Sequence, residues 1–481
     1  MPLRRLHLPG TNGAELRAGF ALIRDELGVP ADFDAAVLAD AEAAARAPHL
    51  PGRDLTHIPF ATLDPPGSRD LDQAYAIERT GSGFRVRYAI ADVAAFVAAG
   101  SKLDLAAHAR VETLYLPDGR VPLYPSVLSE GAASLLPGQA RPALVWTLDL
   151  DPGGRLVGTD VHRAVVRSRE QQAYPDVQRA LDEGTASEPL RLLREVGTLR
   201  QQLQRDRGGM NLAVPSQDIV PAGQGWTLQF RGALQVEDWN AQVSLLTGMA
   251  AAQLMLDGGV GVLRTMPPAD PHDVARLRRV ARGLHIDWPL TDDYGVLLGR
   301  LGAPGGPEAG HVAAFLTEAT SLFRGAAYAA FDGHPPSQPL HAAIAAPYAH
   351  CTAPLRRLVD RYVGEVAVAL CAAKRVPSWA REALPALPQE MAAGERRAHQ
   401  VEHAAVDLVE AAVLSRCVGA QFEGLVVDID ERRGGGSVQI AEPAVLARCE
   451  ATHGPLRIGE PIQVRVLEAD ISRRTVRFVP V

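Results

Sequence analysis

Residues 53–77 read RDLTHIPFATLDPPGSRDLDQAYAI, and this stretch decides most of what the chain can be. The run IPFATL has the apolar and β-branched residues of a strand, and turn-forming residues follow it directly. Pro65 and Pro66 restrict the backbone, while Gly67 permits a sharp bend. We therefore expect a strand followed by a stiff turn that folds the next residues back beside the strand's end.

Three aspartates surround this turn: Asp64, Asp70 and Asp72. If the turn brings their carboxylates together, they repel and raise one another's pKa. A divalent cation removes that penalty, and Mg²⁺ prefers oxygen ligands while keeping water and substrate phosphate in its shell. Such a site can activate a water and neutralise charge on a phosphodiester. The plainer interpretation is an acidic surface turn with solvated side chains, because short acidic motifs often match by chance.

A second motif, YAHCTAPLRRLVDRYVGEV at residues 348–366, predicts the start of a helix rich in arginine. Thr352 can cap this helix, and Pro354 suits its first turn. Three arginines follow in its first half: Arg356, Arg357 and Arg361. Asp360 can pair with Arg356. A helix N-terminus with guanidinium groups forms an anion site, and the plainer alternative is a charged solvent face with one intrahelical ion pair.

A third motif, TLYLPDGRVPLYP at residues 113–125, places Tyr115 among apolar residues before a Pro-Asp-Gly turn. An aromatic side chain near an active site can stack on a base. Packing in the core is the default role of a lone tyrosine in a strand.

The composition excludes several classes of protein. The 481 residues are 47% hydrophobic and 22% charged, so the chain is globular rather than disordered. A formal net charge of −7 counts mildly against a nucleic-acid partner, although a local channel can still be positive. The sequence shows no secretory signal and no apolar run that predicts a membrane span. Its four cysteines lack metal-ligand spacing, which favours reduced thiols and a cytoplasmic protein.

The pattern divides the chain into three parts and predicts an α+β multidomain fold. Residues 1–57 form a short helical segment, and residues 58–418 mix strands and helices like one large catalytic-type domain. Within it, the pattern predicts helix from about residue 168 to 207 and a long helix that ends at Gly258. Residues 419–481 predict five short strands, which is the size of an OB barrel. Such barrels often bind single-stranded nucleic acid, but this one has few aromatic residues and no basic excess.

The first segment leaves two interpretations open. Its two helices, separated at Pro30, allow a helix-turn-helix that reads DNA. The acidic residues of the second helix, Asp32, Asp34, Asp40 and Glu42, would repel phosphates. A helical arm packed on the next domain is therefore favoured.

The order and spacing of these motifs resemble the ribonuclease II / ribonuclease R family of exoribonucleases over roughly residues 50–481. RDLTHIPFATLDPPGSRDLDQAYAI resembles the family's metal-binding signature, and YAHCTAPLRRLVDR resembles its Thr-Ser-Pro-Ile-Arg-Arg segment. The block IADVAAFVAAGSKLDLAAHARVETLYLPDGRVPLYPSVLSEGAASLLPG resembles the one that follows the signature, and the tail resembles an S1-type OB domain. The expected fold is thus a mixed α/β RNB-type catalytic domain with a C-terminal S1 barrel.

The resemblance implies processive hydrolysis of single-stranded RNA from its 3′ end, which releases nucleoside 5′-monophosphates in the presence of Mg²⁺. By motif position, Asp64 and Asp70 would be Mg²⁺ ligands. Asp72 would be the catalytic aspartate, which helps to hold the metal and to activate water. The family also suggests a monomer, and the lack of a long apolar run predicts no membrane partner.

The same resemblance implies the RNA contacts. Arg356 would clamp the scissile or the adjacent phosphate, with Arg357 beside it. Tyr115 falls where the family has a tyrosine that stacks on the 3′-terminal bases and sets the final product length. Glu402, in HQVEHAAVDLV, falls near a family glutamate close to the RNA end.

Two departures from the family pattern matter. The family has a fourth acid directly after the third, where this chain has Gln73, so the second metal position and full activity are in question. A short helical segment also stands where the family has two cold-shock barrels. We therefore expect a more open RNA entrance that tolerates structured RNA. The alternative function is a catalytically weakened relative that binds RNA.

Overall fold

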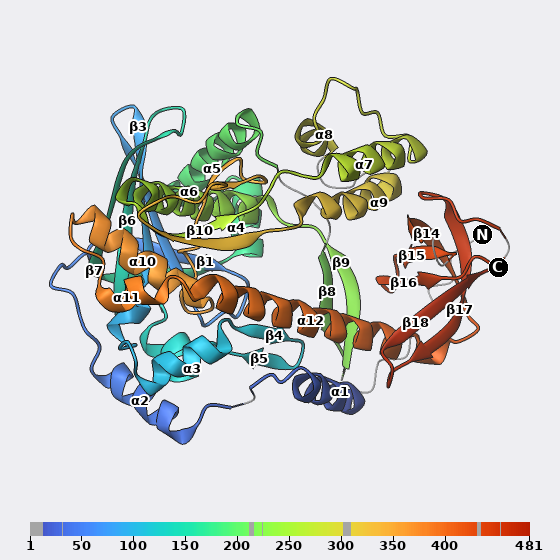
Figure 1. Ribbon diagram of the computed structural model, residues 1–481, viewed down its shortest axis with the longest axis horizontal. Coiled ribbons are helices and arrows are strands. Elements are labelled where there is room, and N and C mark those ends of the chain that lie inside the picture. The colour runs from blue at the N-terminus through green and yellow to red at the C-terminus, as the bar shows by residue number, and fades with distance from the viewer. Residues whose placement is uncertain are drawn as a thin grey trace.

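The computed structural model describes residues 13–30, 32–210, 216–223, 225–301, 309–430, 434–452 and 454–481. It contains two β-barrels that lie at opposite ends of the molecule, with helices around and between them (Figure 1). This arrangement confirms the mixed α/β fold with a five-stranded barrel at the C-terminus.

The first barrel carries the motifs that the sequence singled out. Its strands close in the order β1-β2-β3-β6-β7. They are β1 (Phe60–Asp64), β2 (Gln73–Thr80), β3 (Gly83–Ala91), β6 (Ala140–Leu150) and β7 (Leu156–Ala173). β1 pairs antiparallel with β2 and parallel with β7, which closes the barrel beside the acidic turn. β7 continues to Ala173, so the expectation of helix from residue 168 was wrong over its first six residues.

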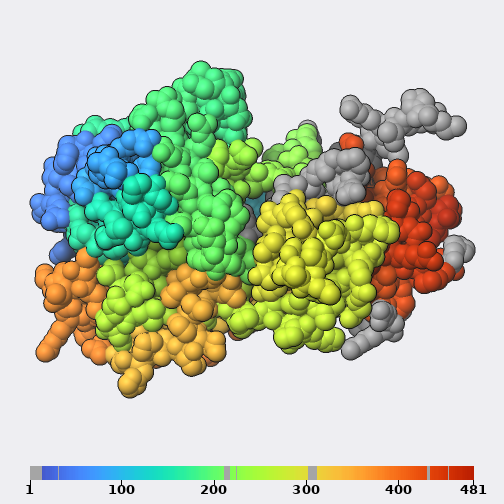
Figure 2. All heavy atoms as spheres, turned by 90° about the horizontal axis from the view of Figure 1, so that it is seen from above, coloured from blue at the N-terminus to red at the C-terminus, as the bar shows by residue number. Residues whose placement is uncertain are grey.

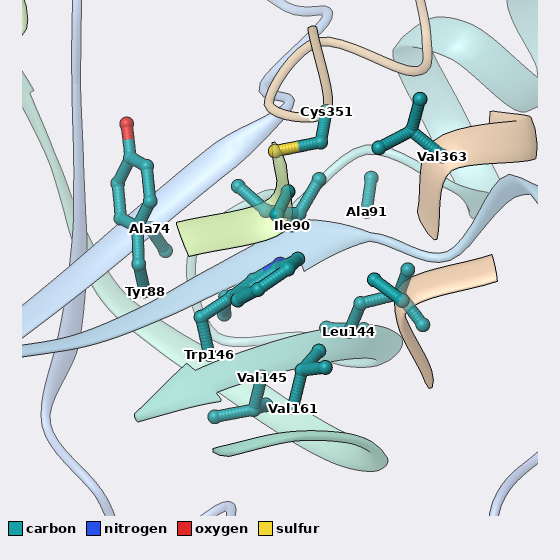
Figure 3. Packing of buried hydrophobic residues seen from close by; sticks show 14 of the residues in the cluster. Ala74, Tyr88, Ile90, Ala91, Leu144, Val145, Trp146, Val161, Cys351 and Val363 are labelled. Carbon is teal, nitrogen blue, oxygen red and sulfur yellow. The ribbon is translucent and has the colours of Figure 1, made fainter. Parts of the chain in front are cut away.

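Large apolar side chains fill this barrel and join it to the surrounding helices. Trp146 of β6 lies beside Ile90 of β3, while Cys351 and Val363 approach the same core from the arginine motif (Figure 3). All four side chains are at most 2% exposed. The arginine motif is therefore fixed to the barrel by packing, which holds its position relative to the acidic turn.

Helices and short hairpins surround the barrel. The helices are α3 (Lys102–Arg110), α4 (Tyr174–Asp182), α5 (Glu188–Asp206), α6 (Gln235–Gly258), α7 (Pro271–Gly283), α8 (Tyr294–Leu301), α9 (Ala309–Ala319), α10 (Leu358–Cys371), α11 (Ser378–Ala383) and α12 (Leu387–Leu414). The two-stranded pairs are β4 (Leu114–Leu116) with β5 (Gly119–Val121), β8 (Ser216–Ala222) with β9 (Gly225–Arg231), β10 (Val260–Thr265) with β11 (Ala327–Asp332), and β12 (Leu340–His341) with β13 (Ala346–Pro347). Helix α6 ends at Gly258 as predicted. Among the described residues no helix is long and apolar enough to cross a membrane, and all four cysteines are free thiols.

The C-terminal barrel closes in the order β14-β15-β16-β18-β17. Its strands are β14 (Gln421–Ile429), β15 (Gly436–Ile440), β16 (Val445–Cys449), β17 (Pro461–Asp470) and β18 (Thr475–Pro480). Helices α7–α9 lie between the two ends of the molecule (yellow in Figure 2) and share a buried apolar cluster with Val427 of β14. The long helix α12 also reaches this barrel, so the second barrel is docked at several places (Figure 1).

The two N-terminal helices pack on different parts of the molecule. In α1 (Gly13–Glu26) the buried residues Leu16, Phe20 and Ile23 belong to the apolar cluster of α12 and the second barrel. In α2 (Ala35–Arg46) the buried residues Val37 and Ala41 belong to the core of the first barrel. The helices therefore do not form the shared core of a helix-turn-helix, which favours the interpretation as a packed helical arm.

The contact between α12 and the second barrel predicts a pH-dependent stability. Glu410 is 5% exposed, and its Oε1 accepts hydrogen bonds from the Leu446 N–H (2.9 Å) and the Gln217 Nε2–H (2.7 Å). Burial is the main cause that raises the pKa of Glu410 to about 7, against an ordinary value of 4.5. The folded state therefore keeps the proton longer than the unfolded state, so this group's contribution is lost as pH rises through about 7.

We expect Glu410→Gln to melt at nearly the same temperature as the wild type at pH 5 and clearly higher at pH 8. The amide oxygen can accept both hydrogen bonds without an ionisation penalty, which for this buried group is about 3 kcal/mol. Thermal melts across this pH range measure the difference. Glu402→Gln, a change at an exposed glutamate of the same helix, serves as control. A melting temperature for Glu410→Gln at pH 8 at or below that of the wild type would contradict the prediction.

Candidate active site

The acidic turn is a tightly held loop between β1 and β2. Gly67 adopts a φ of 81°, which favours glycine, and the Ser68 N–H donates to the Pro65 carbonyl oxygen. Ser134 then fixes the returning chain: its hydroxyl accepts from the Leu71 N–H (2.9 Å) and donates to the Arg69 carbonyl oxygen (2.6 Å). The stiff turn expected from the sequence is therefore present, and the residues after it run back into the barrel.

Asp72 is the most deeply buried of the three aspartates, at 3% exposure. Its Oδ1 accepts a hydrogen bond from the Leu355 N–H (2.7 Å), and its Oδ2 lies 3.3 Å from Nε of Arg356. Burial is the main cause that raises the pKa of Asp72 to about 7, while Arg356 and the Leu355 N–H oppose that shift. The acidic turn and the arginine motif, which lie nearly 300 residues apart in sequence, thus meet at this carboxylate.

Asp64 ends β1 and faces the same arginine. Burial is the main cause that raises its pKa to about 6; Arg356 opposes the shift, and the charge of Asp70 adds to it. Its Oδ2 is buried and has no hydrogen-bond partner. A buried acceptor without a partner costs free energy, so binding of a proton or a cation to this oxygen would be favourable.

Asp70 is held by the hairpin of β4 and β5. Its Oδ1 pairs with Nη1 of Arg120 (2.7 Å), and its Oδ2 accepts a hydrogen bond from the Tyr115 hydroxyl (3.2 Å). The side chain of Asp70 is 14% exposed, whereas Tyr115 is 54% exposed. The predicted stacking tyrosine is therefore not a core residue, because it lies at the surface with its hydroxyl on a predicted metal ligand.

The arginine motif differs from the expectation at the start of its helix, in the partner of Asp360 and in the position of Arg361. Helix α10 begins at Leu358, after Thr352 and Pro354, because residues 354–356 form a turn before the helix. Asp360 pairs with Arg357 rather than with Arg356, through contacts of 3.0 and 3.1 Å, and its Oδ1 also accepts from the Ala353 N–H.

Arg361 does not project as predicted. It is 3% exposed and pairs with Asp104 at 2.5 Å. With Arg357 and Arg361 engaged in these pairs, Arg356 is the arginine whose side chain remains open, at 46% exposure. It is the guanidinium best placed to meet a phosphate.

Glu402 lies away from the other predicted residues. Its side chain is 74% exposed on α12, with its carboxylate 3.9 Å from His399. On the same helix Glu395 pairs with Arg264 at 2.8 Å. Burial, and then the charge of Glu395, raises the pKa of Glu112, whose backbone bridges to Arg357. Of the described residues of α12, Glu395 is thus a glutamate that the structure does bring close to the arginine motif.

Gln73, at the position of the family's fourth acid, is engaged with neutral partners. Its Oε1 accepts hydrogen bonds from the hydroxyls of Tyr88 and Ser244, the latter at 3.3 Å. These two hydroxyls also lie within 2.9 Å of each other. The amide oxygen therefore ties β2 to β3 and α6.

Sequence reasoning missed two residues of the site. Arg120 binds Asp70, and its position opposite Tyr115 follows from a hairpin with a two-residue turn, so the sequence held that signal. For Tyr174, at the start of α4, the sequence contained no comparable indication of a place in the site. Its pKa is raised to about 12, mainly by burial and further by the charge of Asp64, and its hydroxyl accepts a hydrogen bond from Nδ2 of Asn240.

The donor set fits a hard divalent cation in kind. All three predicted ligands, Asp64, Asp70 and Asp72, offer carboxylate oxygens, and the unpartnered Oδ2 of Asp64 needs a counter-charge. The sequence led us to expect that the three side chains converge, and this expectation was wrong. Within the part of the chain that the structure describes, no three His, Cys, Asp or Glu side chains form a ready metal-binding group. Asp70 is turned to Arg120 and Tyr115 instead.

Two family models match the chain. The RNB domain model matches residues 52–371, and the model of the RNase II-type exonuclease C-terminal S1 domain matches residues 420–481. Together they account for both barrels.

Curated relatives carry related names. The chain is similar to the exosome complex exonuclease dis3 of Schizosaccharomyces pombe, with 27% identity over 315 residues that cover 63% of this chain and 32% of that protein. It is similar to ribonuclease R of Aquifex aeolicus, with 25% identity over 462 residues that cover 89% of this chain and 64% of that protein. The chain thus spans less than two thirds of the length of either relative.

Solved structures share the fold. Ribonuclease R of Mycoplasma genitalium, in complex with ribose-methylated single-stranded RNA, gives a TM-score of 0.85 at 19% identity, covering 97% of this chain and 78% of that chain. Yeast Ssd1, a pseudonuclease, gives a TM-score of 0.69 at 17% identity, covering 87% of this chain and 53% of that chain. Because the RNB model matches more than half of its residues, this chain belongs to the RNB-domain family and carries the S1 domain of RNase II-type exonucleases at its C-terminus.

Proposed function

We propose that this chain is an exoribonuclease that hydrolyses single-stranded RNA processively from its 3′ end, with Mg²⁺, and releases nucleoside 5′-monophosphates. The observation that carries the proposal is the meeting of Asp72 with Arg356, beside the unpartnered Asp64 oxygen. A buried carboxylate against an open guanidinium offers both a group that can take a proton and a group that can bind phosphate. The predicted division at residues 57/58 and 418/419, the cytoplasmic location and the monomeric state remain predictions.

The chain's own residues account for most of the chemistry. Arg356 binds the scissile phosphate with its open guanidinium and neutralises charge that develops there. The Oδ2 of Asp72, 3.3 Å from Nε of Arg356, then faces the same phosphate and can orient the attacking water and take its proton. Asp64, Asp70 and Asp72 would hold Mg²⁺, which when bound supplies a more acidic water and charge neutralisation.

Digestion of a 5′-labelled single-stranded RNA tests the proposal. We expect the full-length strand to be converted to a short 5′-labelled product with few intermediates, and no cleavage in EDTA. A uniformly labelled strand should release nucleoside 5′-monophosphates. A trap of unlabelled RNA measures processivity. Cleavage within the strand, release of 3′-monophosphates or full activity in EDTA would contradict the proposal.

A second candidate function is RNA binding without cleavage. The observation that favours it is Gln73, whose amide oxygen is engaged by Tyr88 and Ser244 instead of adding a fourth acid to the loop. Ssd1 shows that a protein of similar fold can be a pseudonuclease. Retention of labelled RNA with no mononucleotide released in Mg²⁺ would establish this function in place of the first.

Tyr115→Ala should leave cleavage intact and lengthen the smallest product. The exposed ring lies beside the acidic loop, and stacking on a base contributes about 1–3 kcal/mol, so its loss releases short RNA before the last cuts. Tyr115→Phe is the matched control, because it keeps the ring and removes only the hydroxyl. A product ladder unchanged in the alanine variant would show that the stacking residue lies elsewhere.

We also expect the enzyme to digest a hairpin with a short 3′ overhang up to the stem. The residues that the structure describes ahead of the first barrel form α1 and α2, which pack against the body of the protein. They leave the RNA entrance without a further barrel made by this part of the chain. Digestion of a series of overhang lengths measures the point of arrest, and arrest many nucleotides before the stem would contradict this expectation.

A further inference from the structure

Asp70 is one of the three predicted metal ligands of the acidic turn, together with Asp64 and Asp72. A cation that gathers the three carboxylates must therefore draw Asp70 in. Both oxygens of Asp70 are already engaged, however, by Arg120 and by the Tyr115 hydroxyl.

The hairpin of β4 and β5 explains why these two partners act together. Tyr115 lies directly opposite Arg120 in its register, so both side chains extend from the same face. The other face is anchored, because Leu114, Leu116 and Val121 are buried in the apolar cluster of α12. The hairpin thus presents a tyrosine and an arginine to one carboxylate from a fixed base.

Arg120 has a second anchor that keeps it near Asp70. Its Nη2 lies 2.7 Å from Oε1 of Glu130, in the short helical segment Leu128–Ala132. The Arg120 side chain is 26% exposed, so a ligand can reach it. A guanidinium in this position repels a divalent cation on Asp70. It can also leave its ion pair with the Asp70 carboxylate and bind a phosphate instead.

We propose that Arg120 is a positioning residue that holds Asp70 away from the metal until RNA arrives. A phosphate of the 3′-terminal nucleotides, bound beside Tyr115, takes the Arg120 guanidinium, and Asp70 is released to join Asp64 and Asp72. RNA and the cation then bind cooperatively, and the coupling acts equally in both directions. This inference rests on the proposed function, because it assumes that the acidic loop binds a divalent cation.

Mn²⁺ binding to the full chain, followed by electron paramagnetic resonance, tests the proposal without reference to turnover. In the absence of RNA, we expect Arg120→Gln to bind Mn²⁺ about fivefold more tightly than the wild type or better, since the competing charge is gone. Arg120→Lys keeps a positive charge and should bind Mn²⁺ like the wild type. Ribose-methylated single-stranded RNA should tighten Mn²⁺ binding to the wild type about fivefold or more, and have little effect on Arg120→Gln.

A second variant should shift the affinity for Mn²⁺ in the opposite direction. It tests the role of Arg120 even if Arg120→Gln fails to fold. Glu130→Gln removes the other anchor, leaves Arg120 to Asp70 alone and should weaken Mn²⁺ binding. Unchanged or weaker Mn²⁺ binding in Arg120→Gln, or unchanged or tighter binding in Glu130→Gln, overturns the inference while the proposed function stands. A wild type that binds no Mn²⁺, either with or without RNA, overturns the inference together with the metal-dependent function.

Discussion

Asp72→Asn should reduce RNA cleavage by about a thousandfold or more while leaving RNA affinity nearly unchanged. The substitution keeps the shape of the side chain and an oxygen for the Leu355 N–H, but it removes the negative charge that faces Arg356. A loss of that size corresponds to about 4 kcal/mol of activation free energy, which is typical when a group that acts on the reacting atoms is removed. Single-turnover cleavage of a labelled RNA measures the rate, and filter retention measures the affinity.

Asp149→Asn is the matched control for this change. Asp149 pairs with Arg85 on the outside of the first barrel, where its side chain is 36% exposed, so its replacement should leave the cleavage rate unchanged. Cleavage by Asp72→Asn within tenfold of the wild type would remove Asp72 from the chemistry. A large loss of RNA affinity would assign it to binding instead.

Arg356→Ala should lower the cleavage rate about a hundredfold to a thousandfold and should cost less stability than removal of the neighbouring Arg357. The Arg356 side chain is open and makes only a 3.3 Å contact with Asp72, so its removal takes away a phosphate ligand but little packing. Arg356→Lys should recover only part of the rate, because an ammonium group does not reproduce the planar fork of a guanidinium. Rates and thermal melts are measured on the same preparations.

The neighbouring arginine gives the contrasting result. Arg357 holds Asp360, which is 1% exposed and also binds the Ala353 N–H. Arg357→Ala leaves that carboxylate without its counter-charge, which costs about 3–5 kcal/mol of stability. If Arg357→Ala instead melted like the wild type and lost affinity for RNA, the phosphate contact would belong to Arg357 rather than to Arg356.

Local sequence was sufficient for much of the fold. The strand that ends at Asp64, the bend at Gly67 and the helix that ends at Gly258 follow from apolar periodicity and turn chemistry, which act over a few residues. The alternating strands of the tail likewise predicted the second barrel. Residues 168–173 were misassigned because pairing with β1 extends β7 beyond the point where its own sequence favours a strand.

The partners of the site residues could not be predicted in the same way. Asp72 meets the Leu355 N–H across 283 positions, and Gln73 meets Ser244 across 171, so only the assembled barrel brings these groups together. Asp360 could pair with either neighbouring arginine at helical spacing, and the late start of α10 decides for Arg357. The roles of Asp64, Tyr115 and Glu402 came from the resemblance to a family. Among the described residues, Glu402 has no partner near the acidic turn.

A crystal structure of the chain with Mn²⁺ and a ribose-methylated single-stranded RNA would test most directly the claim that RNA is cut at the aspartates of the acidic turn. The account predicts an anomalous manganese peak within bonding distance of Asp64 and Asp72, a 3′-terminal phosphate on Arg356 and a base on the ring of Tyr115. Manganese bound elsewhere, or an RNA end distant from Arg356, would contradict it.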